Sequence, residues 1–253
     1  NGISTAWLGA LGYAMQILFD FSGYTDMAIG LGQMFGFDLP ENFNFPYTAL
    51  SISDFWRRWH ITLSSWFRDY VFYPLEFKRR KQKTFRIESN TLIVFFLTGF
   101  WHGAGWQFIA WGMWHGIFAS LEAFLRVKKV KTKAPTAIRY FVTMLIVLVG
   151  WVLFRSPGIK YGLQYLGVMF GLVKPLETGL MLNWYLNGKI AFVLALAILA
   201  CIPWKRLLPG VFERLSASKL NDQVRLITAL ILLGFSIMIV ISSTYSSFIY
   251  FKF

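Results

Sequence analysis

Long apolar runs with very few charges constrain the fold of this chain more than any other feature. Such runs occupy residues 3–21, 91–125, 138–154, 184–203 and 226–250. Lipid provides no hydrogen-bond partner for exposed peptide groups, so a long apolar run indicates a membrane-spanning segment. Several such runs in one chain predict an all-α polytopic membrane protein.

Positive charge is concentrated between the apolar runs. The 253 residues carry a net charge of +13 although only 15% of them are charged, and most Lys and Arg residues fall in Lys78–Arg86, Arg126–Arg139 and Lys205–Arg225. Soluble domains contain about a quarter charged residues. Basic loops between spans follow the positive-inside rule, so we place all three segments on the cytoplasmic side and expect no nucleic-acid partner.

The apolar block 91–125 is predicted to form a short hairpin. It is flanked by basic segments on one side of the membrane, so it must leave that side and return. At about 1.5 Å per residue, its length barely makes two crossings of a hydrocarbon layer about 30 Å thick. We expect Gly103–Gly105 to form the tip of this short or re-entrant hairpin. Irregular backbone at membrane depth must be covered by protein or a water-filled cavity, which puts His102 beside a cavity.

The other segments are predicted from the same periodicity and from turn residues. We expect a helix over 3–21 that breaks at Ser22-Gly23 and resumes over 24–36. Residues 51–86 are predicted to comprise an amphipathic helix over 51–75 and a solvated, cytoplasmic basic loop. In 159–182 the pattern Gly167-xxx-Gly171 is typical of helix packing.

Residues 1–253 are expected to form a single membrane domain with spans over 138–154, 184–203 and 226–250, and with a basic loop over 205–225. Because the chain starts at Asn1 without an initial Met or a signal peptide, we expect it to be a piece of a longer protein.

The triplet Trp-His-Gly occurs twice, at 101–103 and 114–116, and these two histidines and His60 are the only three in the chain. Small residues four apart, such as Gly99 with Gly103, let helices approach closely and explain the glycines. They do not explain the histidines, because an ionisable group in a span normally faces the bundle interior or a pathway. His102 directly precedes the predicted break, so it is the stronger candidate for chemistry and His115 is the structural one.

A second candidate cluster lies in the amphipathic segment 53–69. Asp54 is three and four residues before Arg57 and Arg58, the spacing of ion pairs on a helix surface, and His60 and Ser64 share a face at i, i+4. Adjacent arginines suit a phosphate-bearing substrate. The alternative is an interfacial helix whose Trp and Arg side chains anchor at the lipid headgroups.

A metal or haem site is not favoured. The histidines of the two triplets are 13 residues apart, which turns their side chains about 140° from each other on a continuous helix. A two-haem arrangement would need four histidines. Neither Cys residues nor an acidic cluster accompanies the histidines, and Cys201 is the only cysteine. We expect no metal and no bound cofactor.

Three blocks of the chain together resemble the membrane-bound O-acyltransferases, with the bacterial alginate O-acetyltransferase branch as the nearest. The blocks are Phe19–Tyr47 (FDFSGYTDMAIGLGQMFGFDLPENFNFPY), Ser51–Leu75 (SISDFWRRWHITLSSWFRDYVFYPL) and Thr98–Gly116 (TGFWHGAGWQFIAWGMWHG). They span about the first half of the chain, and from about Ala134 only generic spans match. This branch is similar to the teichoic acid D-alanyltransferases. The family's fold is a multi-helix bundle with short or re-entrant helices around a central funnel, and its members are longer at the N-terminus.

The resemblance implies a function and a set of site residues. It makes His102 the catalytic histidine, as base or as acyl relay, and His60 the second histidine that orients or stabilises the reacting groups. Arg57 and Arg58 are candidates for donor phosphates, and Trp101 and Ser64 for further substrate contacts. The implied reaction moves an acetyl group from cytoplasmic acetyl-CoA to hydroxyls of an exported cell-envelope polysaccharide.

The resemblance also implies an extracytoplasmic partner of the SGNH hydrolase-like type and a multi-pass location in the inner or plasma membrane. Two other functions stay open. One is D-alanyl transfer to teichoic acid, and the other is a polysaccharide export or transport subunit without acyl transfer. The chain has the broken helix of many carriers but no detectable inverted repeat.

Overall fold

The fold is all-helical, as predicted, in a computed structural model that describes residues 2–130, 133–174, 182–216 and 219–242. Within these ranges, four helices are long and apolar enough to cross a membrane: Gly2–Met34, Trp106–Val127, Thr136–Arg155 and Asp222–Ser242. The chain divides into two compact units, residues 1–201 and 202–253, and each is described by itself. The single-domain prediction stays a prediction.

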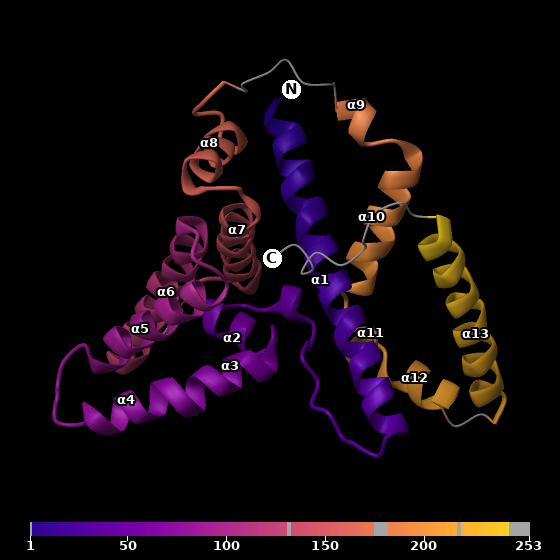
Figure 1. Cartoon of the computed structure of the whole chain (residues 1–253), viewed down its shortest axis with the longest axis horizontal. Helices are drawn as coiled ribbons and strands as arrows, with labels where there is room; N and C mark the ends of the chain where they lie inside the picture. The colour runs from indigo at the N-terminus through magenta and orange to yellow at the C-terminus, as the bar shows by residue number, and fades with distance from the viewer. Residues whose placement is uncertain (1, 131–132, 175–181, 217–218, 243–253) are drawn as a thin grey trace. The chain divides into compact units, whose positions relative to one another are not determined.

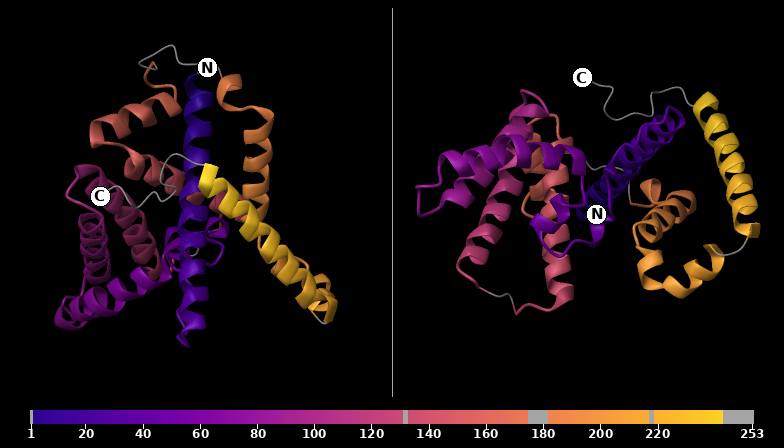
Figure 2. Two further views of the ribbon diagram at one scale, coloured as in Figure 1. Left: turned by 45° about the vertical axis from the view of Figure 1, so that its right-hand side comes forward. Right: turned by 90° about the horizontal axis from the view of Figure 1, so that it is seen from below.

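Helix α1 (Gly2–Met34) runs without interruption through the predicted break at Ser22-Gly23, so that prediction was wrong. Figure 2 shows α1 as one long helix. A lone glycine inside a helix costs only about 1 kcal/mol relative to alanine and, unlike proline, removes no hydrogen bond. The hydroxyl of Thr25 donates to the carbonyl of Ser22 at 2.9 Å, within the continuous helical turn.

The predicted amphipathic helix exists as a series of short pieces. A 3₁₀ turn η1 (Pro46–Thr48) leads into α2 (Ile52–Trp56), and α3 (Ile61–Phe67) begins after a break. A π-helical turn η2 (Arg68–Phe72) then continues directly into α4 (Tyr73–Lys78). Figure 1 shows α3 and α4 following one another along the lower edge of the first unit, with α2 above α3. The break between α2 and α3 contains His60 and becomes part of the candidate site.

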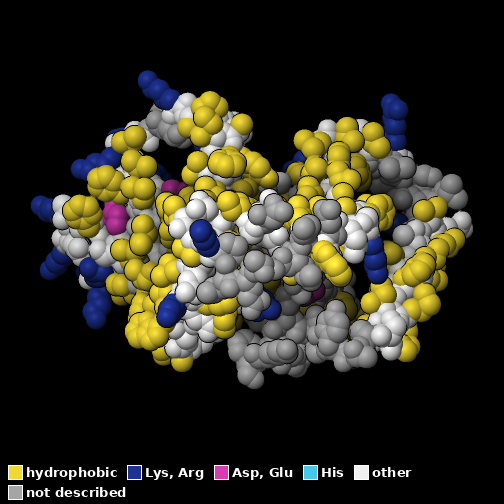
Figure 3. Space-filling model, turned by 90° about the horizontal axis from the view of Figure 1, so that it is seen from above, with side chains coloured by type: hydrophobic (Ala, Val, Ile, Leu, Met, Phe, Trp, Pro, Cys, Tyr) yellow, Lys and Arg dark blue, Asp and Glu magenta, His cyan; other side chains and the backbone are white. Residues whose placement is uncertain are grey.

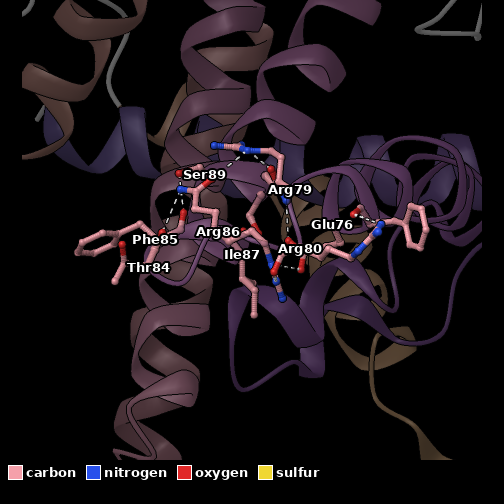
Figure 4. A network of polar contacts seen from close by, with 12 residues as sticks. Glu76, Arg79, Arg80, Thr84, Phe85, Arg86, Ile87 and Ser89 are labelled. Atoms are coloured by element: carbon pink, nitrogen blue, oxygen red, sulfur yellow. Dashed lines mark hydrogen bonds and ion pairs between the residues drawn. The ribbon is translucent and has the colours of Figure 1, made fainter.

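The segment between α4 and α5 was predicted to be a solvated basic loop, and for two of its arginines this was wrong. Figure 4 shows the polar network that holds them. Arg86 Nε pairs with Glu76 Oε2 at 2.9 Å, and the amide of the fully buried Asn90 donates to Glu76 Oε1 at 2.6 Å. Arg79 donates to the Asn90 oxygen, also at 2.6 Å. The Glu76 carboxylate therefore connects α4, through Arg86 and Asn90, to the start of α5.

The predicted hairpin is confirmed as α5 (Arg86–Trp101) and α6 (Trp106–Val127). Gly103, at a φ of 144°, adopts a backbone conformation that residues with a side chain rarely take, and it lies in the turn between the helices. The glycine packing is confirmed for Gly99, where a Cβ would lie 2.5 Å from the carbonyl oxygen of Phe108, but not for Gly103, which lies beyond the end of α5. Larger residues at such contacts would separate the two helices.

Helix α7 (Thr136–Arg155) confirms the predicted span over 138–154, and α8 (Ile159–Met169) comes after it. The prediction that Gly167 and Gly171 form a packing pair was wrong. Gly171, at a φ of 71°, lies beyond the end of α8, and Leu172 N donates to Gly167 O at 2.8 Å. These features form a Schellman motif that ends the helix. The rest of the predicted connection, residues 175–181, lies outside the described residues.

The predicted span over 184–203 was also wrong. It is divided into α9 (Leu182–Tyr185) and α10 (Gly188–Ala200), separated by Asn187. The Asn187 side chain accepts a hydrogen bond from Ile190 N at 2.9 Å and caps α10. At 1.5 Å per residue, α10 is about 20 Å long, which is short for a crossing.

The second unit contains α11 (Trp204–Leu207), α12 (Pro209–Ser216) and α13 (Lys219–Ser242). Much of the predicted basic loop 205–225 is therefore helical, which corrects that expectation. The predicted last span, 226–250, is confirmed in α13 as far as Ser242, and its remaining residues lie outside the described part of the chain.

Exposed apolar side chains are abundant in the described residues, including nearly every large hydrophobic residue of α13. Figure 3 shows one face on which they predominate, with Lys and Arg side chains protruding. A surface of this kind is suited to lipid rather than to water. The protein is a multi-pass membrane protein.

Candidate functional site

His102 lies at the point where the hairpin turns. It ends α5, and its backbone N–H donates to Gly99 O at 3.2 Å. Its imidazole is only 6% exposed and is surrounded by aromatic rings. The nearest are Trp101 and Trp111, both with centroids 4.9 Å away, and Phe154 of α7 at 5.1 Å. Helix breakage therefore places His102 where three helices meet. The break at His102 was predicted from the sequence, and its predicted position beside a cavity stays a prediction.

His60 lies in the break between α2 and α3, in a left-handed backbone conformation with φ 43° and ψ 56°. This conformation is uncommon for residues other than glycine and is held only where the surroundings impose it. Asn44 N donates to Arg58 O at 2.9 Å, and Ile61 N donates to Asn42 O at 3.0 Å. The loop before α2 thus pairs with the backbone on both sides of His60.

The side chain of Asn42 is the polar partner of His60. Asn42 Oδ1 lies 3.2 Å from His60 Nδ1, and it also accepts from the backbone N–H of Thr62 at 3.1 Å and from the Thr62 hydroxyl at 2.9 Å. Burial of the imidazole, against the ring of Phe21 at 4.7 Å, lowers the pKa of His60 to about 4. His60 is therefore neutral at physiological pH.

The structure brings the two candidate histidines into one aromatic cluster. Trp59 contacts Trp151 of α7 at 4.8 Å, and Trp151 contacts both Trp111 and Phe154, the neighbours of His102. The two imidazoles are close enough to interact electrostatically, so a charge on His60 disfavours a charge on His102. The cluster therefore favours chemistry in which the two histidines are not both protonated.

The two candidate arginines differ in the exposure of their side chains. Both pair with Asp54 as their spacing predicted: Arg57 Nη2 at 3.3 Å and Arg58 Nε at 3.1 Å from the same carboxylate oxygen. Burial raises the pKa of Asp54, but the contacts with Arg58, Leu50 N and Arg57 outweigh burial and lower it. The Arg57 side chain is 72% exposed and that of Arg58 only 23%. Arg57 is thus the arginine with donors free for a ligand.

The remaining two candidates are Trp101 and Ser64. Trp101 is 58% exposed and packs edge-on against His102. Ser64 donates its hydroxyl to Trp59 O at 3.3 Å, and its backbone N–H donates to His60 O at 3.0 Å, where α3 begins. The predicted shared face of His60 and Ser64 stays a prediction. Ser64 also lines a pocket of about 190 Å³, together with Trp56, Phe67, Arg68 and Phe95 among others.

His115 occupies a very different environment inside α6. It is fully buried, it stacks on Phe55 with the centroids 6.2 Å apart, and its Nε2 lies against Gly150 of α7. Among the described residues, neither of its ring nitrogens has a hydrogen-bond partner. This is a packing position, as expected for the second triplet.

Sequence reasoning missed Asn42, Thr62 and the aromatic residues around His102. Asn42 had a signal in the turn-rich stretch DLPENFNFP (38–46), but nothing in that stretch indicates His60 as its partner. No group of three or more His, Cys, Asp or Glu side chains that could hold a metal ion occurs in the described ranges.

Comparisons with known proteins give a consistent result. Residues 1–162 match the sequence profile of the membrane-bound O-acyltransferase family. The chain is 49% identical over 166 residues to the probable alginate O-acetylase AlgI of Azotobacter vinelandii, which covers 65% of this chain and 32% of that protein. It is 34% identical over 268 residues to the peptidoglycan O-acetyltransferase of Helicobacter pylori, which covers 98% of this chain and 49% of that protein.

A third relative is named for a different activity. The teichoic acid D-alanyltransferase of Bacillus subtilis is 39% identical over 142 residues, which cover 54% of this chain and 36% of that protein. The chain thus spans between a third and a half of the length of these relatives.

Proposed function

This chain belongs to the membrane-bound O-acyltransferase family, and from that premise we propose that it is the histidine-bearing part of an enzyme that O-acetylates a cell-envelope polysaccharide. The observation that carries the proposal is the position of His102 at a helix break, in one cluster with His60. The alginate and peptidoglycan enzymes among the relatives support a polysaccharide hydroxyl as acceptor.

In the proposed reaction, His102 acts as the general base. A sugar hydroxyl attacks the carbonyl carbon of the acetyl thioester while its proton moves to the imidazole. A C–O bond forms, the C–S bond of the thioester breaks, and the proton passes on to the departing sulfur. In a second form of the mechanism, His102 first takes the acetyl group and then gives it to the hydroxyl, so the same groups act in two steps. His60 orients the reactants or stabilises the developing oxyanion.

The donor is proposed to be acetyl-CoA, entering from the cytoplasmic side, on which the positive-inside rule predicts the basic segments. Arg57 is better placed than Arg58 for its phosphates, because most of its side chain is exposed. We further propose that the protein lies in the inner or plasma membrane and works with an extracytoplasmic SGNH-type acetyltransferase.

The test uses the full-length protein with acetyl-CoA labelled in the acetyl group. Wild type is expected to consume the donor and label an envelope polysaccharide. His102→Ala is expected to insert into the membrane at wild-type level without labelling the polysaccharide. Labelling by the variant at the wild-type rate would remove His102 from the mechanism.

The same experiment separates the alternatives. Labelling with D-alanine from an activated donor, in place of acetate, would establish D-alanyl transfer, which the Bacillus subtilis relative supports. Export of polysaccharide without donor consumption would establish a transport subunit.

A further inference from the structure

The side chain of Asn42 decides the hydrogen-bonding state of His60. Asn42 Oδ1 is within hydrogen-bond distance of three groups: the backbone N–H of Thr62, its hydroxyl, and Nδ1 of His60. A backbone N–H can only donate. The atom of Asn42 that faces Thr62 must therefore be the acceptor oxygen and not the amide nitrogen, which removes the usual ambiguity of an asparagine side chain.

The identity of that atom fixes the proton on the imidazole. An amide oxygen has no proton to give, so Nδ1 of a bonded His60 must carry the hydrogen. In a neutral imidazole, the other nitrogen then has the lone pair. Within the described part of the chain, no side chain hydrogen-bonds to His60 Nε2. His60 thus offers one unprotonated nitrogen to a ligand.

Both the backbone and the side chain of Asn42 hold the segment around His60. Asn42 is only 9% exposed, and its backbone carbonyl accepts from Ile61 N at 3.0 Å. His60 is held in its uncommon left-handed conformation between these two Asn42 contacts. Backbone and side chain of one residue therefore set both the path of the chain at His60 and the orientation of its ring.

We infer that Asn42 is a positioning residue that holds His60 as the Nδ1-protonated tautomer, so that Nε2 accepts a hydrogen bond from a sugar hydroxyl next to the one that His102 deprotonates. The inference rests on the proposed function for the identity of that ligand. It also chooses between the two roles offered above for His60. A nitrogen with a lone pair orients a hydroxyl, whereas stabilising an oxyanion requires a donor, so His60 positions the sugar that carries the nucleophile.

The titratable surroundings of His60 are simple. His102 is the group with which it interacts electrostatically, from the hairpin between α5 and α6. Asp20 lies beside Phe21 on α1, and Asp54 pairs with Arg57 and Arg58 on its own segment. None of these acids hydrogen-bonds to the imidazole, so a carboxylate introduced at position 42 would be its first direct anionic partner.

The first experiment measures the tautomer itself in full-length protein labelled with ¹⁵N-histidine. The His60 signals are identified by their loss in His60→Gln. We expect Nδ1 to be protonated and Nε2 bare in wild type, and a mixture of tautomers in Asn42→Ala. This readout needs no enzyme activity, so it stands even where the proposed reaction fails. A protonated Nε2 in wild type would overturn the inference.

The second experiment measures acetyl transfer. Asn42→Ala is expected to lower kcat by about 10- to 100-fold with an unchanged KM for the donor, by analogy with the loss of partners that orient metal-bound histidines. Asn187→Ala is the matched control, because the Asn187 side chain also accepts from a backbone N–H, but it caps α10 and hydrogen-bonds to no histidine among the described residues. Equal kcat values in both variants would contradict a positioning role.

Asn42→Asp keeps all three hydrogen bonds but adds a negative charge beside the ring. An adjacent carboxylate favours the imidazolium and raises the pKa of His60. Because the protonated ring cannot accept a hydrogen bond at Nε2, the acidic limb of the rate profile is expected to move up by about one pH unit or more. A profile that coincides with that of wild type in a folded Asn42→Asp protein would count against the inference.

Discussion

The two Trp-His-Gly triplets are identical in sequence and opposite in structure. In the first, α5 ends at Trp101, His102 lies at the break and Gly103 has a φ of 144°. In the second, all three residues lie inside α6, and His115 is fully buried. Because the triplets themselves are the same, the difference must come from their neighbours in the chain.

The two residues immediately after each triplet explain the contrast. Gly103 is succeeded by Ala104 and Gly105, and two glycines so close together favour a turn over a helix. Gly116 is succeeded by Ile117 and Phe118, which continue the apolar face of α6. His102 therefore lies at a helix end, whereas His115 is packed against Phe55 and Gly150 inside the bundle. Three predictions test this comparison, from the largest expected effect to the smallest.

The largest difference is expected in activity. His102→Gln in the full-length protein should lower acetyl transfer by about 10²- to 10⁴-fold, the usual contribution of a general base. His115→Leu should retain activity within about threefold, because it replaces a buried ring without hydrogen bonds by an apolar side chain of similar volume. The measurement is the initial rate of acetyl transfer by each variant at equal levels in the membrane. A larger loss of activity in His115→Leu than in His102→Gln would reverse the assignment of the two triplets.

The glycines should differ in stability. Gly103→Ala forces a side chain into a positive-φ conformation and gains nothing in return, so it should cost about 1–3 kcal/mol. Gly116→Ala brings a Cβ to 2.8 Å from Phe95 Cβ, but alanine recovers about 1 kcal/mol as the better helix former. Thermal unfolding in detergent measures the midpoints of both variants, and we expect the lower midpoint for Gly103→Ala. A wild-type midpoint in Gly103→Ala would show that the turn at Gly103 is not strained.

Substitution of the two tryptophans should have the smallest effect on stability. Trp114 Nε1 donates to Ile146 O at 2.8 Å, so Trp114→Phe should cost about 1 kcal/mol for the lost hydrogen bond between α6 and α7. Trp101 is 58% exposed, and Trp101→Phe should leave the unfolding midpoint unchanged. The same thermal assay compares them, and a midpoint that falls further in Trp101→Phe would contradict the packing described for the second triplet.

Much of the fold was predictable because its signals are local. The apolar runs predicted α7 and the spanning part of α13, and the Gly-Ala-Gly sequence predicted the hairpin turn. The failures have physical causes as well. Gly23 did not break α1, because one glycine is a small cost against a long apolar helix. Asn187 divided a run that hydropathy alone treated as one span, because a capping side chain begins a new helix there.

The site was predictable only in part. His102 was identified by its position before a break, and the pairing of Asp54 with both arginines was predicted by helical spacing. The left-handed backbone of His60 at the start of α3 was not predicted, because helical spacing says nothing about the residue that begins a helix. Asn42 was missed because its partner is 18 residues away across a loop.

By itself, the sequence determined that this protein is a helical membrane protein of a known acyltransferase family, and that one of its two triplets lies at a hairpin turn. These properties depend on hydropathy, glycine spacing and motif order, all of which are read along the chain. Only the tertiary structure decided that Asn42 holds His60, that Trp151 links the two histidines and that His115 has no polar partner among the described residues. Each of these depends on side chains that meet in space, since burial and hydrogen bonding act between segments distant in the sequence.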